Sequence, residues 1–176
     1  MHIDRRFGEM TEAGYQQRAL CQGLDVSKPV GAVEPYDYLT GVYGRHWRVQ
    51  VKCSMALQPN GIYQVGASQV VRGPAGKRRS VPYSPDEIDF FAIFLAPEHS
   101  WYIVPIEVVD GRRTLGIHSR THKKVGPWLP YFEAWDLLRQ TGEDVVLPAP
   151  EPNCPSPGRK RLGRRKPSAG PIDYSI

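Results

Sequence analysis

The sequence has 176 residues and a hydrophobic content of 40%, which is enough for one domain with a buried core. No apolar run approaches the roughly 20 residues that a membrane-spanning helix needs, and MHIDRRFGEM lacks the apolar segment of a signal peptide. We therefore expect a protein that does not enter membranes and stays in the cytoplasm. The 3 cysteines are scattered without CxxC spacing, which argues against a disulfide framework or a zinc ribbon.

The net charge of +5 is unevenly distributed along the chain. Residues 159–166, RKRLGRRK, hold six of the 23 basic residues, and residues 1–147 then carry 17 basic and 16 acidic groups. Residues 148–176 are rich in proline and have too little apolar sequence to fold alone. The sequence therefore predicts a nearly neutral domain over residues 1–147, followed by a disordered basic tail over residues 148–176.

The first expected elements are a helix and a hairpin. Asp4 can cap a helix that ends near Gly23, with apolar positions such as Phe7 and Met10 at helical spacing. Residues 36–40 and 45–53 are extended segments around a short glycine-containing turn, which is the pattern of a β-hairpin.

Further strands and a second helix are expected after the hairpin. Residues 61–72 alternate well enough to form one strand, and residues 73–83 have the Gly, Pro, Lys and Arg content of a loop. The apolar run 88–95 predicts a buried central strand with residues 101–106 as its neighbour. Residues 127–140 space their aromatic side chains as in an amphipathic helix. This order predicts an α+β domain.

The segment WRVQVKC, residues 47–53, places Gln50 and Lys52 on one face of a strand, because strand side chains alternate. In the simplest interpretation these are solvent-facing strand residues. However, Asp37 lies at the end of the preceding strand, and the hairpin brings it alongside Gln50 and Lys52. Glu9, on the first helix, is a candidate for a fourth group near them.

Such a set has a chemical use. Mg²⁺ takes oxygen ligands, typically one or two carboxylates together with waters and phosphate oxygens. A bound cation polarises a phosphate and lowers the pKa of a bound water. A lysine next to it can orient the attacking water and offset the charge that develops on the phosphate oxygens.

The order of these motifs resembles that of the PD-(D/E)XK nuclease superfamily. The matching text is RRFGEMTEA, GLDVSKPVGAVEPYDYL, GRHWRVQVKC and IDFFAIFLAPEHSWYIVPIEVV, and it covers roughly residues 5–139. The chain is most similar to small endonucleases related to group I intron homing enzymes, and more distantly to archaeal Holliday junction resolvases. The resemblance implies a restriction-endonuclease-like core, with a mixed sheet flanked by helices.

The resemblance also implies roles for individual residues. Asp37 matches the main metal-ligating aspartate, Gln50 occupies a position that is Asp or Glu in most members and Gln in the intron-type branch, and Lys52 matches the catalytic lysine. Glu9 matches the helical glutamate that helps to bind metal; Glu12 competes for this role, and the GE match favours Glu9. The implied cofactor is Mg²⁺, with Mn²⁺ as a substitute. We interpret Asp89, which starts the apolar strand, as structural.

Basic residues outside this set are candidates for contacts with DNA phosphates. His118 and His122 lie four residues apart, a spacing that on a helix could hold a metal. The segment around them has no apolar periodicity, so we expect a basic surface loop there rather than a metal site. The candidate DNA-contacting residues are Lys77, Arg78, Arg79, Lys123 and Lys124.

The sequence therefore predicts a metal-dependent endonuclease that hydrolyses DNA phosphodiester bonds. Cutting both strands with one site per chain would favour a homodimer or a higher homo-oligomer. Two alternatives remain open at this point: a DNA-binding protein that keeps the fold without its chemistry, and an RNA-associated accessory protein that binds nucleic acid through its basic tail.

Overall fold

The computed structural model describes residues 3–31, 33–73, 76–122 and 126–140, so the predicted end of the domain at residue 147 and the tail 148–176 lie outside the described residues. The helical elements are α1 (Ile3–Cys21), α2 (Ile106–Val109) and the 3-10 turns η2 (Ala96–Glu98), η3 (Leu129–Tyr131) and η4 (Trp135–Arg139). The strands are β1 (Asp25–Ser27), β2 (Tyr38–Val42), β3 (Arg45–Ser54), β4 (Ile62–Gly66), β5 (Ser68–Arg72), β6 (Arg78–Pro82), β7 (Phe90–Leu95), β8 (Ser100–Pro105) and β9 (Thr114–His118). The predicted α+β class is confirmed.

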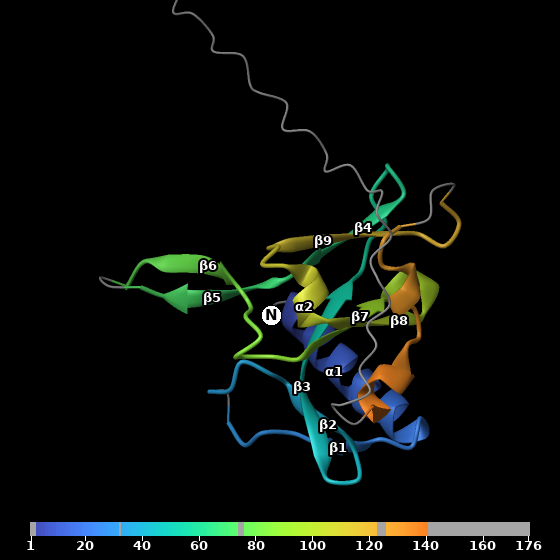
Figure 1. Cartoon of the computed structure of the whole chain (residues 1–176). Coiled ribbons are helices and arrows are strands. Elements are labelled where there is room, and N and C mark those ends of the chain that lie inside the picture. Colours follow the sequence, from blue (N-terminus) through green and yellow to red (C-terminus); the bar gives the residue numbers. More distant parts are fainter. Residues whose placement is uncertain (1–2, 32, 74–75, 123–125, 141–176) are drawn as a thin grey trace, which may run out of the picture.

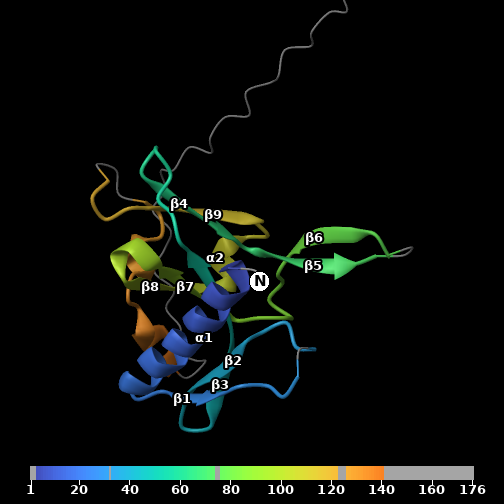
Figure 2. The same cartoon turned by 180° about the vertical axis from the view of Figure 1, so that it is seen from behind.

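The largest sheet has five strands in the order β1-β2-β3-β7-β8 (Figure 1). The β3–β7 pair is parallel, whereas the other three pairs are antiparallel, so the sheet is mixed as expected. The helix α1 packs against β1 and β3 and is drawn in front of the sheet when the molecule is seen from behind (Figure 2). No described helix has the length and apolar character to cross a membrane.

The first helix has the predicted extent but a different buried face. Thr11, Tyr15 and Ala19, spaced four residues apart, are buried, whereas Met10 is 66% exposed. The Tyr15 hydroxyl donates a hydrogen bond of 2.9 Å to the hydroxyl of Thr40 on β2. This hydrogen bond connects α1 to β2, the strand that begins directly after Asp37.

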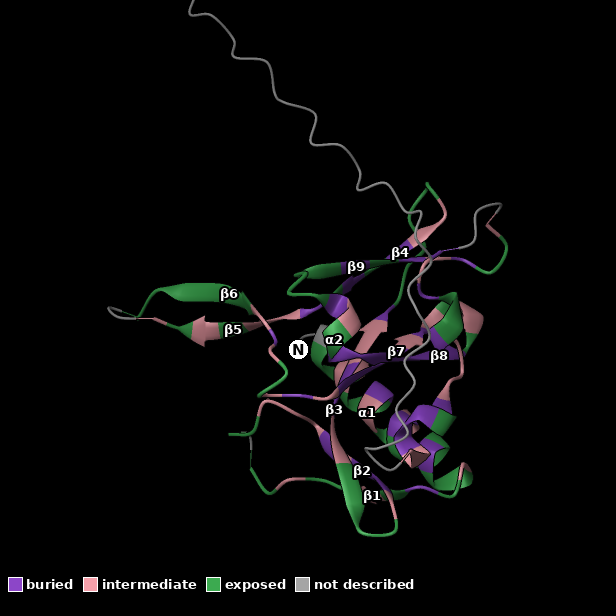
Figure 3. Cartoon of the chain, in the orientation of Figure 1, coloured by how far each residue is buried: buried purple, intermediate pink, exposed green. Residues whose placement is uncertain are grey.

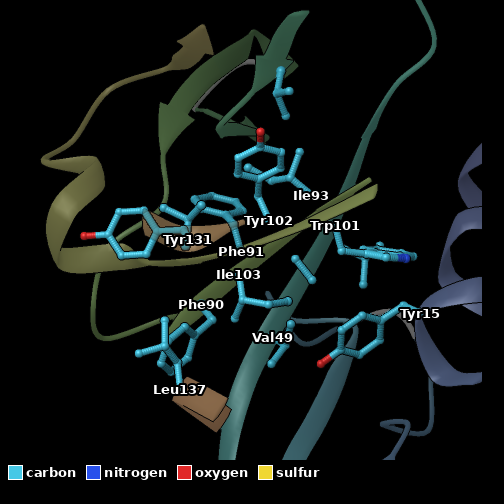
Figure 4. Close-up of a cluster of buried hydrophobic side chains, with 14 of the residues drawn as sticks. Tyr15, Val49, Phe90, Phe91, Ile93, Trp101, Tyr102, Ile103, Tyr131 and Leu137 are labelled. Carbon is cyan, nitrogen blue, oxygen red and sulfur yellow. The ribbon is translucent and has the colours of Figure 1, made fainter. Parts of the chain in front are cut away.

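The predicted hairpin is confirmed as β2 and β3, joined by Tyr43 and Gly44. Both residues have positive φ, 53° and 80°, as a two-residue turn of the primed type requires. The predicted buried strand and its neighbour are also confirmed, as β7 and β8, which pair in antiparallel register. Their side chains form the centre of the core with those of β3 and α1 (Figure 4).

Two segments between these strands differ from the prediction. Residues 61–72 form two strands, because the chain leaves one ladder after Gly66 and enters another at Ser68. As a result, β4 pairs with β9, whereas β5 pairs with β6. The predicted loop over residues 73–83 contains β6, since its arginines stand opposite residues of β5 on a solvent-exposed ribbon and need no apolar alternation.

The prediction of a helix over residues 127–140 is wrong. Pro127 and Pro130 lack the backbone N–H that a continuous helix needs, and Glu133 has a φ of 48°, which interrupts helical geometry. The segment instead forms η3 and η4. Its aromatic side chains still reach the core, where Trp135 stacks on Tyr15 with ring centroids 5.8 Å apart.

Candidate active site

Asp37 stands immediately before β2, at the point where the chain enters the hairpin. Its backbone N–H donates to the carbonyl of Val49 at 2.9 Å, and its Oδ2 accepts a hydrogen bond of 2.8 Å from the N–H of Val51. The same Oδ2 accepts a bond of 2.7 Å from Nε2 of Gln50. The neighbouring strand therefore holds one oxygen of this carboxylate, and among the described residues the other oxygen, Oδ1, has no hydrogen-bond donor.

Gln50 lies in the interior strand β3 and is only 8% exposed. Its amide points its nitrogen at Asp37, because the opposite orientation would place two electronegative oxygens against each other. The side chain is thus a donor toward the carboxylate, and its own carbonyl oxygen is directed away from that contact. Sequence reasoning placed Gln50 beside Asp37, and the structure brings them together.

Lys52 follows two residues later and is half-buried. Burial lowers the pKa of Lys52, while the negative charge of Asp37 acts in the opposite direction. Its Nζ lies 3.4 Å from the hydroxyl of Tyr83 and 5.1 Å from the centroid of that ring. The ammonium group is therefore positioned by one aromatic side chain, and the negative charge of Asp37 acts on it.

Of the acidic residues on α1, Glu12 is the one whose charge acts on Asp37 and Lys52. Its Oε2 accepts a hydrogen bond of 2.7 Å from Nζ of Lys28, and its charge acts on the pKa values of both Asp37 and Lys52. Glu9, which sequence reasoning preferred, pairs with Arg5 at 3.1 Å on a part of the helix where its side chain is 63% exposed. A step of three residues turns a helical side chain by about 60° in net direction, and this rotation separates the two acids.

Burial raises the pKa of Asp37 above its usual range, and the hydrogen bond from Val51 opposes this effect. The nearby charge of Glu12 raises the pKa further, whereas the positive charges of Lys52 and Lys28 lower it.

We call the group formed by Glu12, Lys28, Asp37, Gln50, Lys52 and Tyr83 the Asp37 cluster. Raised carboxylate pKa values of this kind are typical of functional sites.

The oxygen donors of the Asp37 cluster suit a hard divalent cation. The described residues contain no group of three His, Cys, Asp or Glu side chains that could hold a metal, so a zinc-like site is not built from them. Mg²⁺ commonly binds through one or two carboxylates and keeps several waters. Asp37 offers the free Oδ1, and Glu12 offers a second carboxylate whose present partner is the exposed Lys28.

The remaining predicted residues have different locations. Arg78 and Arg79 lie on β6, Lys77 immediately precedes it, and all three are exposed on the ribbon that projects outward in Figure 1. Lys123 and Lys124 lie outside the described residues. Asp89 has the structural role expected of it, because its carboxylate accepts bonds from the backbone N–H and the guanidinium of Arg48 at 2.7 to 3.1 Å.

Sequence reasoning missed Tyr83. It lies in the segment predicted as a loop, directly after β6, and reaches Lys52 from 31 positions along the chain. Its ring packs edge-on against Phe91 of β7, with centroids 5.4 Å apart. No local pattern marks a tyrosine that is fixed by such a distant contact.

A helical acid packed on a mixed sheet, with an aspartate and a Gln-x-Lys pair presented by one hairpin, is the arrangement expected of the PD-(D/E)XK fold. The chain belongs to the PD-(D/E)XK endonuclease family, whose sequence model matches residues 2–138. A solved bacterial homing endonuclease, I-Ssp6803I, is similar in fold, with a TM-score of 0.67 and 24% identity over 77% of this chain and 93% of that chain. No curated protein gives a significant match.

Proposed function

We propose that this protein is a Mg²⁺-dependent endonuclease that hydrolyses phosphodiester bonds of DNA. The observation that carries the proposal is the Asp37 carboxylate, which is fixed through one oxygen by β3 while the other oxygen remains available beside Lys52. Family membership supports the reaction class, and the oxygen-rich donor set supports the choice of ion.

In this proposal, Asp37 and Glu12 hold the cation, and the Gln50 amide turns over from its present orientation so that its carbonyl oxygen becomes a neutral ligand. A cation at this position polarises the phosphate and acidifies a bound water. The half-buried Lys52 donates hydrogen bonds from Nζ, and it orients the attacking water and stabilises negative charge on the phosphate oxygens. Tyr83 keeps Nζ aimed at this space through its hydroxyl and ring.

One observation favours a second candidate function. Gln50 donates to Asp37, so the cluster has one negative charge fewer than a site with an acid at this position. Fewer ligand charges weaken affinity for a divalent cation. The second candidate is therefore a DNA-binding protein that keeps this fold without cleaving its substrate.

The deciding experiment incubates the full chain with supercoiled, linear and branched DNA in Mg²⁺, Mn²⁺ or EDTA. Asp37→Asn and Lys52→Met remove charge at nearly constant volume, and Asn keeps an oxygen for the bonds from Gln50 and Val51. Asp136→Asn is the matched control, because Asp136 is 88% exposed and pairs with Arg139, its one salt-bridge partner among the described residues. We expect metal-dependent cleavage by the wild type and the control and at least a 100-fold loss in the other two variants.

Cleavage retained in Asp37→Asn or Lys52→Met would disprove the site. Binding of all three DNA forms without cleavage in either metal would favour the second candidate. Isothermal titration with Mn²⁺ gives an independent readout, since the nuclease should bind the ion through Asp37 and the Asp37→Asn variant should not.

A further inference from the structure

The hairpin formed by β5 and β6 projects from the body of the protein in both views (Figures 1 and 2). Its strands pair with each other and with no strand of the other two described sheets. Most of its residues are exposed or half-buried, in contrast to the buried strands β7 and β8 (Figure 3). We call residues 68–73 and 76–82 the projecting hairpin.

The projecting hairpin is poorly stabilised on its own. An isolated two-stranded ribbon is marginally stable at best in water. Residues 68–82 contain no Asp or Glu, and Arg72 stands directly opposite Arg78 in the strand register. Like charges directly opposite each other on a ribbon are destabilising. A polyanionic partner would remove this repulsion, so the charge pattern points to a ligand rather than to a structural role.

The two faces of the projecting hairpin are chemically different. One face is tied to the body at its base, because Gln69 donates a hydrogen bond to Glu87. The other face carries Val70, which is 62% exposed, with the exposed Ser80 opposite it. The pair Arg72 and Arg78 continues this second face toward the tip. The outward face thus combines an apolar group, a hydroxyl and two guanidinium groups.

We propose that the projecting hairpin enters the major groove of duplex DNA and that its outward face reads base edges. The major groove is about 12 Å wide and admits a two-stranded β-ribbon, whereas the corresponding groove of RNA is too narrow for side chains to read. Arginine pairs with O6 and N7 of guanine, serine bonds either donors or acceptors, and an apolar side chain contacts the methyl group of thymine. Arg72, Arg78, Ser80 and Val70 supply these groups.

This inference rests on the proposed function, because it takes DNA as the substrate of the Asp37 cluster. The base of the projecting hairpin adjoins that cluster, since Pro82 is followed by Tyr83, whose hydroxyl lies 3.4 Å from Nζ of Lys52. A five-residue strand spans about 16 Å. At 3.4 Å per base pair this length covers about five base pairs. The bases that are read should therefore lie within about half a helical turn of the cleaved phosphate.

The first test selects sequences from a randomised DNA library by binding to the wild-type chain in EDTA. We expect enrichment of a guanine-containing sequence. Arg78→Ala and Arg72→Ala should each lower the preference at one or two base pairs by about 10-fold. Lys77→Ala should weaken binding evenly across sequences, as loss of a phosphate contact does. Arg45→Ala is the matched control, an exposed arginine at the other hairpin turn, and should leave the preference unchanged.

The second test locates the groove by methylation interference on the selected sequence. Methylation of guanine N7 in the major groove should block binding by the wild type, and this block should disappear at one guanine in Arg78→Ala. Interference confined to adenine N3, in the minor groove, would overturn the inference. Equal preferences in the wild type and both arginine variants, or no enriched sequence at all, would overturn it as well.

These readouts separate the inference from the proposed function because binding is measured without cleavage. A preference that depends on Arg72 and Arg78 in a protein that never cleaves DNA would sustain the hairpin inference and remove the nuclease. Metal-dependent cleavage with a sequence preference that is unchanged in Arg72→Ala and Arg78→Ala would support the nuclease and remove the hairpin inference. Thermal unfolding of each variant checks that the exposed substitutions leave the fold intact.

Discussion

Asp37 and Gln50 are joined by a hydrogen bond of 2.7 Å in which the amide nitrogen of Gln50 donates to Oδ2 of the carboxylate. The bond depends on a neutral amide at position 50, because a carboxylate there would offer only acceptors at this distance. A carboxylate at position 50 would therefore face Asp37 without a shared hydrogen bond unless a proton or a cation lay between them.

Gln50→Glu should make the fold dependent on metal. At neutral pH without divalent ions, two carboxylates would face each other, and we expect a loss of about 1–3 kcal/mol in the free energy of unfolding. A bound cation stabilises the native state by mass action. Addition of Mg²⁺ should therefore raise the melting temperature of the variant more than that of the wild type. Equal shifts in both proteins would show that no cation binds between these residues.

Glu12→Gln and Glu9→Gln form a matched pair on one helix. Glu12 acts electrostatically on Asp37 and Lys52, whereas Glu9 is bonded to Arg5. We expect Glu12→Gln to weaken Mn²⁺ binding and slow cleavage by about 10-fold or more, the loss of one charged ligand. Glu9→Gln should change either quantity by less than about 2-fold. The opposite ranking would restore the preference that the GE motif gave.

The pKa of Asp37 should respond in opposite directions to two neutralising substitutions. Removal of a nearby cation disfavours the carboxylate, so Lys52→Met should raise this pKa further. Removal of a nearby anion favours the carboxylate, so Glu12→Gln should lower it. Carbon-detected NMR of the side-chain carboxyl measures both shifts, and changes of the same sign would contradict the geometry of the cluster.

The raised pKa of Asp37 also makes the free energy of unfolding depend on pH. Because burial raises the folded-state pKa of Asp37 above its ordinary 3.8, the folded state holds the proton more tightly than the unfolded state. The resulting stabilisation is present below pH 3.8 and is lost as pH rises through the folded pKa. Asp37→Asn removes this titration, so the difference in unfolding free energy between wild type and variant should change over that window and stay level above it.

Arg48 and Asp89 fix the alignment of β3 with β7. Hydrogen bonds run both ways, since the Asp89 N–H donates to the carbonyl of Arg48 and the N–H of Arg48 donates to the Asp89 carboxylate. Asp89→Ala removes the carboxylate partner of the Arg48 guanidinium and leaves it with the backbone carbonyls of Pro85 and Asp86, and we expect a loss of about 2 kcal/mol in chemical denaturation. Asp136→Ala, in an exposed pair, should cost less than about 0.5 kcal/mol. Similar losses in the two variants would show that the Arg48–Asp89 pair does not stabilise the alignment of β3 with β7.

Tyr83→Phe should alter the alkaline side of the pH–rate profile. The variant keeps the ring beside Lys52 and its packing on Phe91 but loses the hydroxyl that accepts from Nζ. The charged form of Lys52 is then less stabilised, so its pKa falls further below the ordinary value. Cleavage at pH 9 should drop by more than cleavage at pH 7. Tyr43→Phe, at a fully exposed turn, is the control and should leave the profile unchanged.

The parts that sequence reasoning predicted correctly are those set by local patterns. Gly44 and the alternation around Val49 specify the hairpin, and the hairpin by itself places Asp37 against Gln50. The apolar run of β7 likewise needs no information from distant residues.

The errors arise where distant contacts override local signals. Met10 follows helical spacing but faces solvent, because the sheet packs on Tyr15 instead. Tyr83 carries no motif, and its position follows from packing on Phe91. The arginines of β6 concealed a strand because an exposed ribbon lacks the apolar alternation by which strands are recognised.

The parallel pairing of β3 with β7 also sets the order in which a newly made chain becomes complete. Gln50 and Lys52 stand opposite Phe91 and Ile93, about 40 positions later in synthesis. A nascent chain that ends before Phe90 already contains Asp37, Gln50 and Lys52, yet its β3 would be a bare edge strand without the neighbour that buries it. The ribosome therefore has to release most of the domain before β7 buries this cluster, and partial products hold the hairpin without the packing that surrounds it.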